Sequence, residues 1–247
     1  MPSFFRKKLN TVLQNFGYEL TKIENDPYGI RWLNDIKKLC SAYHKKINIA
    51  FDVGANVGTT SIEMLECSHS VYSFECHPVT FKKLECTLAG TKAQAFEIAL
   101  SDVSGSKVLY DYGELGYINS LSPNARYAVH FKKKASQLQV TTTTIDDFCT
   151  QNSISKIDIL KIDTEGHDFN VLKGAERMLR NNSIAFIYFE FNDFIQEKSA
   201  NGGSLNEVTE YLSSFGFQFV ATYTDYIVTE KKMFVVANAL LFNPSAC

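Results

Sequence analysis

Several common signatures are scarce or absent in this chain of 247 residues. Its six cysteines form no CxxC pair and no regular ladder of spacings, so we expect reduced thiols rather than a zinc site or a disulfide framework. The formal net charge is only −2, which argues against a nucleic-acid partner because such proteins carry a basic excess. No apolar run is long enough to span a bilayer, and no apolar signal-peptide core follows Arg6-Lys7-Lys8. We therefore expect a cytoplasmic protein without a membrane span.

The order of apolar runs and polar breaks predicts an α/β protein. Residues 1–46 have an amphipathic helical pattern broken by turn residues, which predicts an N-terminal helical extension before a single domain of residues 47–247. In this domain strands are predicted at 48–53, 70–75, 94–100, 157–162, 185–191, 218–223 and 233–242, with further extended segments at 107–112 and 139–144. Helices are predicted at 58–67, 78–89, 166–180 and 204–215.

This alternation of strands and helices predicts a doubly wound, Rossmann-like fold. Parallel strands need a crossover connection, and the predicted helices supply it for most of the sheet. The last two strands are joined by residues 224–232 without a helix, so they must pair antiparallel. We expect a seven-stranded, mostly parallel sheet with an antiparallel edge hairpin.

The stretch FDVGANVG, residues 51–58, is the most informative part of the chain. It lies between a buried strand and a helix, the arrangement that holds a nucleotide-like ligand at the carboxyl end of a parallel strand. Gly54 and Gly58 allow close approach of the backbone, and Asn56 is the side chain that best tolerates a positive φ. A turn that cradles a pyrophosphate gains nothing from the carboxylate of Asp52, whereas a ligand with an ammonium group does. S-adenosylmethionine has that ammonium group and no phosphate.

Four blocks together resemble the FkbM family of S-adenosylmethionine-dependent methyltransferases. In order they are FDVGANVGTTS (51–61), FECHPVTFKKLE (74–85), ALSDVSG (99–105) and ILKIDTEGHDFNVLKGA (159–175), within a match of about residues 47–192. The chain departs from the family at Cys76, where proline is usual. That position lines the adenine pocket by its apolar character, so a thiol should serve. The resemblance implies the methyltransferase version of the doubly wound fold and S-adenosylmethionine as the cofactor.

The resemblance also implies which residues bind the cofactor. The methionine part is expected near the first turn, at Asp52, Gly54, Asn56 and Gly58. Glu75, at the end of the second strand, is expected to accept hydrogen bonds from the ribose hydroxyls, and Asp102 to bind the adenine amino group. Each has a structural alternative: Glu75 could be the N-terminal acid of the next helix, and Asp102 could form a turn. His77 could cap the same helix or contact the ligand.

Three residues after the strand 157–162 are predicted to carry catalysis: Asp163, Glu165 and His167. Period-2 geometry places Lys161 and Asp163 on one face, and charges in an apolar strand are costly unless they pair with each other or with a ligand. A base here would take the proton of an attacking hydroxyl, and the ordinary pKa of histidine suits that work. The alternatives are a structural Lys161–Asp163 pair and a helix-capping His167.

The next strand ends in IYFEFN, which places Glu190 and Asn192 at the same carboxyl edge. Carboxylates grouped there could hold Mg²⁺. Nothing in the spacing demands a metal, so no metal site is predicted.

The predicted function is an O-methyltransferase acting on a small-molecule or glycan acceptor, by the resemblance a sugar hydroxyl. The alternatives are a nucleotide-dependent oxidoreductase or epimerase, disfavoured because the spacing is not G-x-G-x-x-G, and a relative that binds the cofactor without catalysis. The acceptor should be recognised by residues 1–46, 113–135 and 193–203. The first of the two internal segments, with Tyr117, Tyr127, Phe131 and Lys132 to Lys134, is predicted to be a mobile lid.

Overall fold

The computed structural model describes residues 31–113, 119–122, 135–191, 203–228 and 233–246. These residues belong to one compact unit that starts at Arg31. Its first element is helix α2 (Arg31–Ala42), which belongs to the same compact unit as the strands that follow. The predicted boundary between residues 46 and 47 stays a prediction. The remainder of the predicted N-terminal extension, residues 1–30, lies outside the described residues.

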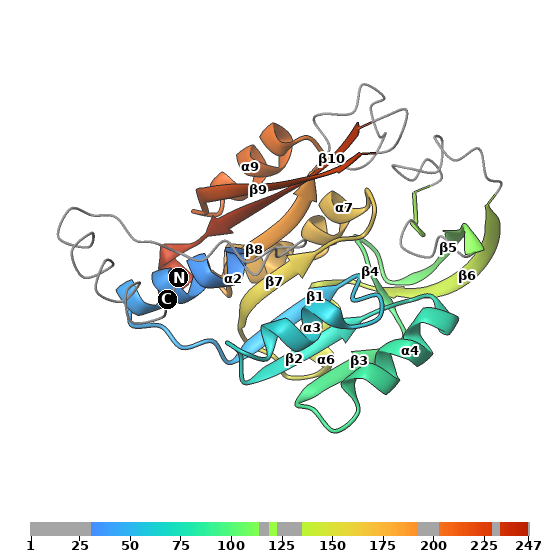
Figure 1. Ribbon diagram of the computed structural model, residues 1–247. Helices are drawn as coiled ribbons and strands as arrows, with labels where there is room; N and C mark the ends of the chain where they lie inside the picture. Colours follow the sequence, from blue (N-terminus) through green and yellow to red (C-terminus); the bar gives the residue numbers. More distant parts are fainter. Residues whose placement is uncertain (1–30, 114–118, 123–134, 192–202, 229–232, 247) are drawn as a thin grey trace, which may run out of the picture. The chain divides into compact units, whose positions relative to one another are not determined.

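The main sheet has seven strands in the order β3-β2-β1-β7-β8-β10-β9 (Figure 1). Their bounds are β1 (Ile49–Val53), β2 (Ser70–Phe74), β3 (Ala93–Phe96), β7 (Ile157–Ile162), β8 (Ile184–Phe191), β9 (Gln218–Val228) and β10 (Met233–Phe242). The first five strands in this order, β3 to β8, form four parallel pairs. β10 pairs antiparallel with both β8 and β9. The predicted sheet with an antiparallel edge hairpin is confirmed.

The predicted strand 94–100 is two strands in the structure. β3 stays in the main sheet, whereas β4 (Ala99–Leu100) pairs with β6 (Ser136–Thr143) in a second sheet of order β4-β6-β5. The antiparallel partner of β6 is β5 (Gly105–Asp111). The chain therefore leaves the main sheet after Phe96, and the small sheet forms a second wall beside the carboxyl ends of the main strands.

Helices cover both faces of the main sheet, as a doubly wound fold requires. They are α3 (Thr59–Met64), α4 (Pro78–Leu88), α6 (Ile145–Gln151), α7 (Asp168–Lys173), α8 (Glu176–Arg180) and α9 (Leu205–Ser213). The predicted helix 166–180 is broken at Gly174 and Ala175. The Asp146 carboxylate accepts the backbone N–H groups of Arg177 and Met178, so the second half begins as a separate, capped helix.

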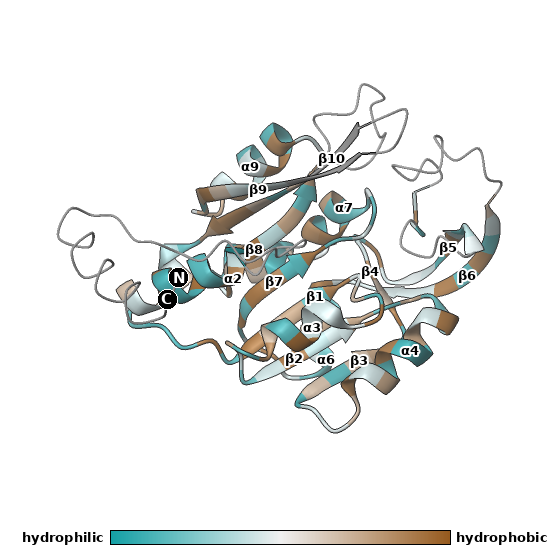
Figure 2. Ribbon diagram, in the orientation of Figure 1, coloured by the Kyte–Doolittle hydropathy of each residue, from teal (hydrophilic) through white to brown (hydrophobic). Residues whose placement is uncertain are grey.

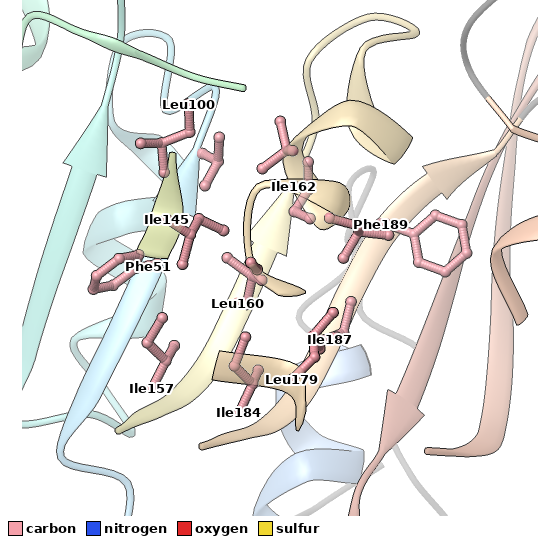
Figure 3. Packing of buried hydrophobic residues seen from close by; sticks show 14 of the residues in the cluster. Phe51, Leu100, Ile145, Ile157, Leu160, Ile162, Leu179, Ile184, Ile187 and Phe189 are labelled. Atoms are coloured by element: carbon pink, nitrogen blue, oxygen red, sulfur yellow. The ribbon is translucent and has the colours of Figure 1, made fainter. Parts of the chain in front are cut away.

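The core lies between the sheet and helices α6 to α9 (Figure 3). Phe51, Leu160 and Ile187 are paired by strand register and point to this face, where Phe148 of α6 and Leu179 of α8 pack against the cluster. The central strands β7 and β8 consist mostly of apolar residues, and Figure 2 colours each residue by its hydropathy. Strands buried on both faces have this composition, which explains why the sequence located them well.

The opposite face carries α2, α3 and α4. The indole of Trp32 on α2 stacks on the Tyr188 ring of β8, with ring centroids 4.3 Å apart, and the Tyr223 hydroxyl donates to Asp35 at 2.7 Å. Asp52, Lys161 and Tyr188 lie side by side on this face. The strand register pairs Asp52 of β1 with Lys161 of β7, and Lys161 with Tyr188 of β8. The polar residues of the site thus extend into the layer between the sheet and these helices.

In the described part of the chain, none of the helices combines the length and the apolar character needed to cross a membrane. The five described cysteines have free thiols, and the sixth, Cys247, lies outside the described residues.

Candidate active site

A cavity of about 190 Å³ lies at the carboxyl ends of β1, β2 and β7. The chain runs from β1 to β2 on one side and places β7 on the other, so this is the point where the strand order reverses and ligands of such folds bind. The second sheet and the segment 119–121 complete the wall. The lining residues are Val53, Gly54, Asn56, Phe74, Glu75, Cys76, Ile98, Ala99, Leu100, Leu109, Asn119, Ser120, Leu121, Asp163, Thr164, Glu165 and His167.

The turn after β1 has the backbone that the sequence predicted. Gly54 has φ +73° and Asn56 has φ +50°, so both adopt the left-handed region. A Cβ atom on Gly54 would lie 1.9 Å from the backbone oxygen of Asp163, which makes glycine necessary for the close approach of this turn to the end of β7. The backbone N–H groups of Gly54 and Ala55 both donate to the Phe74 carbonyl, at 3.0 and 2.9 Å. The turn is therefore fixed to both neighbouring strands.

Glu75 connects this turn to the start of α4. Its carboxylate accepts the Asn56 N–H at 3.1 Å through one oxygen and the His77 N–H at 2.8 Å through the other. Burial raises the pKa of Glu75 above its ordinary value and outweighs these hydrogen bonds, which act in the opposite direction. Each carboxylate oxygen has a further lone pair, so Glu75 can still accept hydrogen bonds from a ligand in the cavity.

His77, by contrast, is a capping residue. It precedes Pro78 at the start of α4, and its Nδ1 accepts the Thr80 N–H at 3.3 Å. His77 is not among the residues that line the cavity, so the structure supports the capping alternative.

Asp52 lies beneath the turn and is completely buried. Its carboxylate accepts the Ser61 hydroxyl at 2.6 Å and pairs with the Lys161 ammonium at 3.0 Å. Burial alone would lower the pKa of Lys161, but the negative charges of Asp52 and Asp163 raise it. Neither Asp52 nor Gly58 lines the cavity. Their predicted contact with the methionine part of a cofactor stays a prediction, and the observed contacts of Asp52 are within the protein.

The Lys161 ammonium links three parts of the site. Besides Asp52, it donates to the Gly54 carbonyl at 3.2 Å and lies 3.6 Å from an Asp163 carboxylate oxygen. Asp163 follows β7 and lines the cavity with 42% of its side chain exposed. Asp163 therefore contacts Lys161 and also lines the cavity, and its catalytic role stays a prediction.

Glu165 lies near Asp163, and the two share the carboxyl edge with Glu190 of β8. One carboxylate oxygen of each of these three residues lies within 4.8 Å of the others. Glu165 has φ +53° and is followed by Gly166 at φ +91°, so the loop after β7 turns sharply here. The spacing would allow a cation to bind, although a group of acids alone does not establish a metal site. Asn192 lies outside the described residues.

His167 is buried, and both of its ring nitrogens are hydrogen-bonded. Asn170 donates to Nδ1 at 3.1 Å, so Nε2 carries the proton and donates to the Ser101 hydroxyl at 2.9 Å. Burial, helped by the charge of Lys107, lowers the pKa of His167 to about 4 against the opposing effect of Asp102. The ring lines the cavity, but its low pKa makes it a weak base, and its unprotonated nitrogen already accepts the hydrogen bond from Asn170, so it is poorly suited to act as a general base.

Asp102 lies apart from the cavity. Its carboxylate accepts the Ser101 hydroxyl at 2.8 Å and the Lys107 ammonium at 2.6 Å. Burial would raise its pKa, but these hydrogen bonds lower it to about 2. Asp102 is not among the residues that line the cavity, and its predicted contact with adenine stays a prediction.

The segment 119–122 contributes residues that the sequence did not single out. The Ser120 hydroxyl donates to the Glu165 carbonyl at 2.8 Å, and the Ser122 hydroxyl donates to the Gly166 carbonyl at 3.3 Å. These contacts hold the loop after β7 against the second sheet. The segment belongs to the predicted lid, whose other parts, 114–118 and 123–134, lie outside the described residues.

Comparison with known proteins identifies the family. The model of the methyltransferase FkbM domain matches residues 52–219, more than half of the chain. The chain belongs to the FkbM methyltransferase family. The predicted resemblance to this family is confirmed.

The FkbM protein is also similar to two curated methyltransferases. Hexuronic acid methyltransferase AglP of Haloferax volcanii is 26% identical over 170 residues, which cover 68% of this chain and 66% of the relative, just under two thirds of its length. The 2-O-methyltransferase NoeI of Sinorhizobium fredii is 22% identical over 190 residues, covering 72% and 76%.

Among solved structures, the magnesium protoporphyrin IX methyltransferase of Synechocystis with bound S-adenosylmethionine superposes with a TM-score of 0.44 at 12% identity, covering 98% of this chain and 96% of that one. A putative RNA methyltransferase of Pyrococcus horikoshii gives 0.46 at 12% identity, covering 96% and 99%.

Proposed function

We propose that this methyltransferase transfers the methyl group of S-adenosylmethionine to a hydroxyl of a sugar or glycan. The observation that carries the proposal is Asp163, a partly exposed carboxylate in the cavity wall, at the edge where β7 and β8 end. Support for a sugar acceptor comes from the relatives, of which one is named for a hexuronic acid and the other for 2-O-methylation.

The cavity fits S-adenosylmethionine, which supplies a methyl group on a positively charged sulfur. The wall carries the carboxylates of Asp163 and Glu165, which suit a cationic ligand, and Glu75 has lone pairs available for ribose hydroxyls. The wall also contains apolar side chains such as Leu109 and Leu121, which suit a flat purine. We assign the cofactor to this cavity on that match of charge and polarity.

In this proposal Asp163 accepts the proton of the attacking hydroxyl. The Lys161 ammonium, 3.6 Å away, holds the carboxylate toward the end of β7, and Glu165 lies close enough to help orient the acceptor. Catalysis then depends on alignment of the hydroxyl with the methyl group and on removal of its proton. We do not retain His167 as the base, because both ring nitrogens are engaged and its pKa is low. Its proposed role is to position the loop that follows β7.

The test is methyl transfer from labelled S-adenosylmethionine to a panel of neutral hexosides, 6-deoxyhexosides and hexuronosides, with an aliphatic alcohol and an amine as controls. We expect label in an alkali-stable methyl ether of one sugar class, and little transfer by Asp163→Asn. The acid Asp102 provides the matched control, since Asp102→Asn should keep most activity. Label in an amine or in an alkali-labile ester would contradict the proposal. Cofactor binding without transfer to any acceptor would favour the non-catalytic alternative.

A further inference from the structure

One polar group in the cavity wall lacks a partner in the described structure. Asn119 lines the cavity, and its side-chain Oδ1 accepts the Tyr112 N–H at 2.9 Å. Its Nδ2 is buried and has no hydrogen-bond partner among the described residues. A buried amide donor without an acceptor is unfavourable, so such a group in a binding cavity indicates an acceptor that a ligand supplies.

The orientation of this amide is fixed by its neighbour. Exchanging the oxygen and nitrogen of the Asn119 side chain would place an NH₂ group against the Tyr112 N–H, two donors facing each other. The amide therefore keeps its oxygen on Tyr112. Its NH₂ group remains a donor for some other acceptor, and solvent does not reach it.

The surroundings of Asn119 favour a purine. Leu109, Leu121 and Cys76 line the same cavity and belong to one apolar cluster. A flat aromatic base fits apolar walls, and adenine carries ring nitrogens that accept hydrogen bonds but cannot donate them. The residue that the sequence predicted for adenine, Asp102, is instead bonded to Ser101 and Lys107 outside the cavity wall.

We propose that Asn119 Nδ2 donates a hydrogen bond to a ring nitrogen of the cofactor's adenine and thereby recognises the base. The proposal rests on the assignment of S-adenosylmethionine to this cavity. It makes Asn119, rather than Asp102, the side chain that distinguishes adenine from bases that present a donor at the same position.

Asn119→Asp gives a direct test because aspartate is nearly isosteric. It retains an oxygen for the Tyr112 N–H and replaces the NH₂ donor with a second oxygen that carries negative charge. Calorimetric titration with S-adenosylhomocysteine should show at least ~10-fold weaker binding for Asn119→Asp, the scale expected when a buried hydrogen bond is lost. Asp102→Asn, the matched control, should bind within about twofold of the parent. The melting temperature of each variant reports whether folding has changed.

Analogues of S-adenosylhomocysteine with N1, N3 or N7 replaced by CH identify the contact. The parent should lose affinity for one of the three, and Asn119→Asp should show no further loss for that analogue, because each change removes the same hydrogen bond. Asn119→Ala, which removes the donor without adding charge, should give the same non-additive pattern.

Three outcomes would overturn the proposal. The first is an affinity of Asn119→Asp for S-adenosylhomocysteine equal to that of the parent. The second is equal affinity of the parent for all three analogues and the natural ligand. The third is an affinity loss in Asn119→Asp with the analogue that equals the sum of the losses from the substitution and from the analogue alone. A parent protein that binds no S-adenosylhomocysteine would overturn the cofactor assignment as well, so the two failures are distinguishable.

Discussion

Replacing Lys161 with methionine would leave Asp52 buried without its cationic partner. The two side chains are 7% and 0% exposed, and the ammonium lies 3.0 Å from the carboxylate. At an effective dielectric constant of about 20 this contact alone corresponds to ~5 kcal/mol of Coulomb attraction. In the variant the ammonium of Lys161 no longer has to be removed from water on folding, but the carboxylate of Asp52 still does. We therefore expect a net loss of about 3–5 kcal/mol in the free energy of unfolding, as for other broken buried pairs.

Urea denaturation, followed by circular dichroism, measures this loss. The matched control is Lys107→Met, which removes an ion pair of 2.6 Å whose side chains are 31% and 36% exposed. An exposed pair contributes only about 0–1 kcal/mol, so this control should stay close to the parent. The double variant Asp52→Asn/Lys161→Met removes both buried charges and should recover most of the lost stability. A Lys161→Met variant no less stable than Lys107→Met, or a double variant without recovery, would refute the reasoning.

Three further predictions follow from the site. Asp163→Asn should lower turnover by ~10² or more while S-adenosylhomocysteine binds nearly as before, and activity within about threefold of the parent would make Asp163 structural. Because the pKa of Glu75 is raised and ribose hydroxyls donate to its ionised form, calorimetry should show cofactor affinity held above that raised pKa and lost as pH falls through it. Glu75→Gln should bind more weakly than the parent above that pKa and approach it below, with a flatter profile, and an equally steep profile would contradict this. For His167 the folded pKa is about 4 and the unfolded value about 6.5, so its contribution to stability should decline as pH falls from 6.5 to 4, by about 3 kcal/mol in total. Urea titrations of His167→Gln should show a shallower decline, and an unchanged decline would assign it to other groups.

The sequence predicted the main sheet well because its central strands are apolar on both faces, a strong local signal. It also predicted the positive φ of Asn56, since the residue type and the turn agree. The departure of β4 into a second sheet was not predicted. That departure depends on pairing of residues 99–100 with residues 142–143, which are far apart in the chain and carry no local pattern for it.

For the site, sequence reasoning placed Gly54, Asn56, Glu75 and Asp163 at one edge, and all four line the cavity. They follow parallel strands, so topology alone brings them together. The burial of Asp52 against Lys161 was harder to predict, because a strand-end acid can point into the sheet layer or toward a ligand.

Asn119 and Ser120 lie in an irregular segment without periodicity, and their roles depend on contacts with Tyr112 and Glu165. A sequence gives no local signal for such contacts. The predicted lid motion of residues 113–135 stays a prediction, since most of that segment lies outside the described residues.

The central claim is that the cavity at the ends of β1, β2 and β7 binds S-adenosylmethionine through Glu75. Calorimetric titration of S-adenosylhomocysteine into the parent and Glu75→Ala tests it most directly, with NAD as the competing ligand class. We predict saturable 1:1 binding to the parent, no binding of NAD, and an affinity lower by about 2 kcal/mol, or ~30-fold, in Glu75→Ala, as for loss of a charged hydrogen-bond acceptor. Equal affinity in the two proteins, or binding of NAD in place of S-adenosylhomocysteine, would contradict the claim.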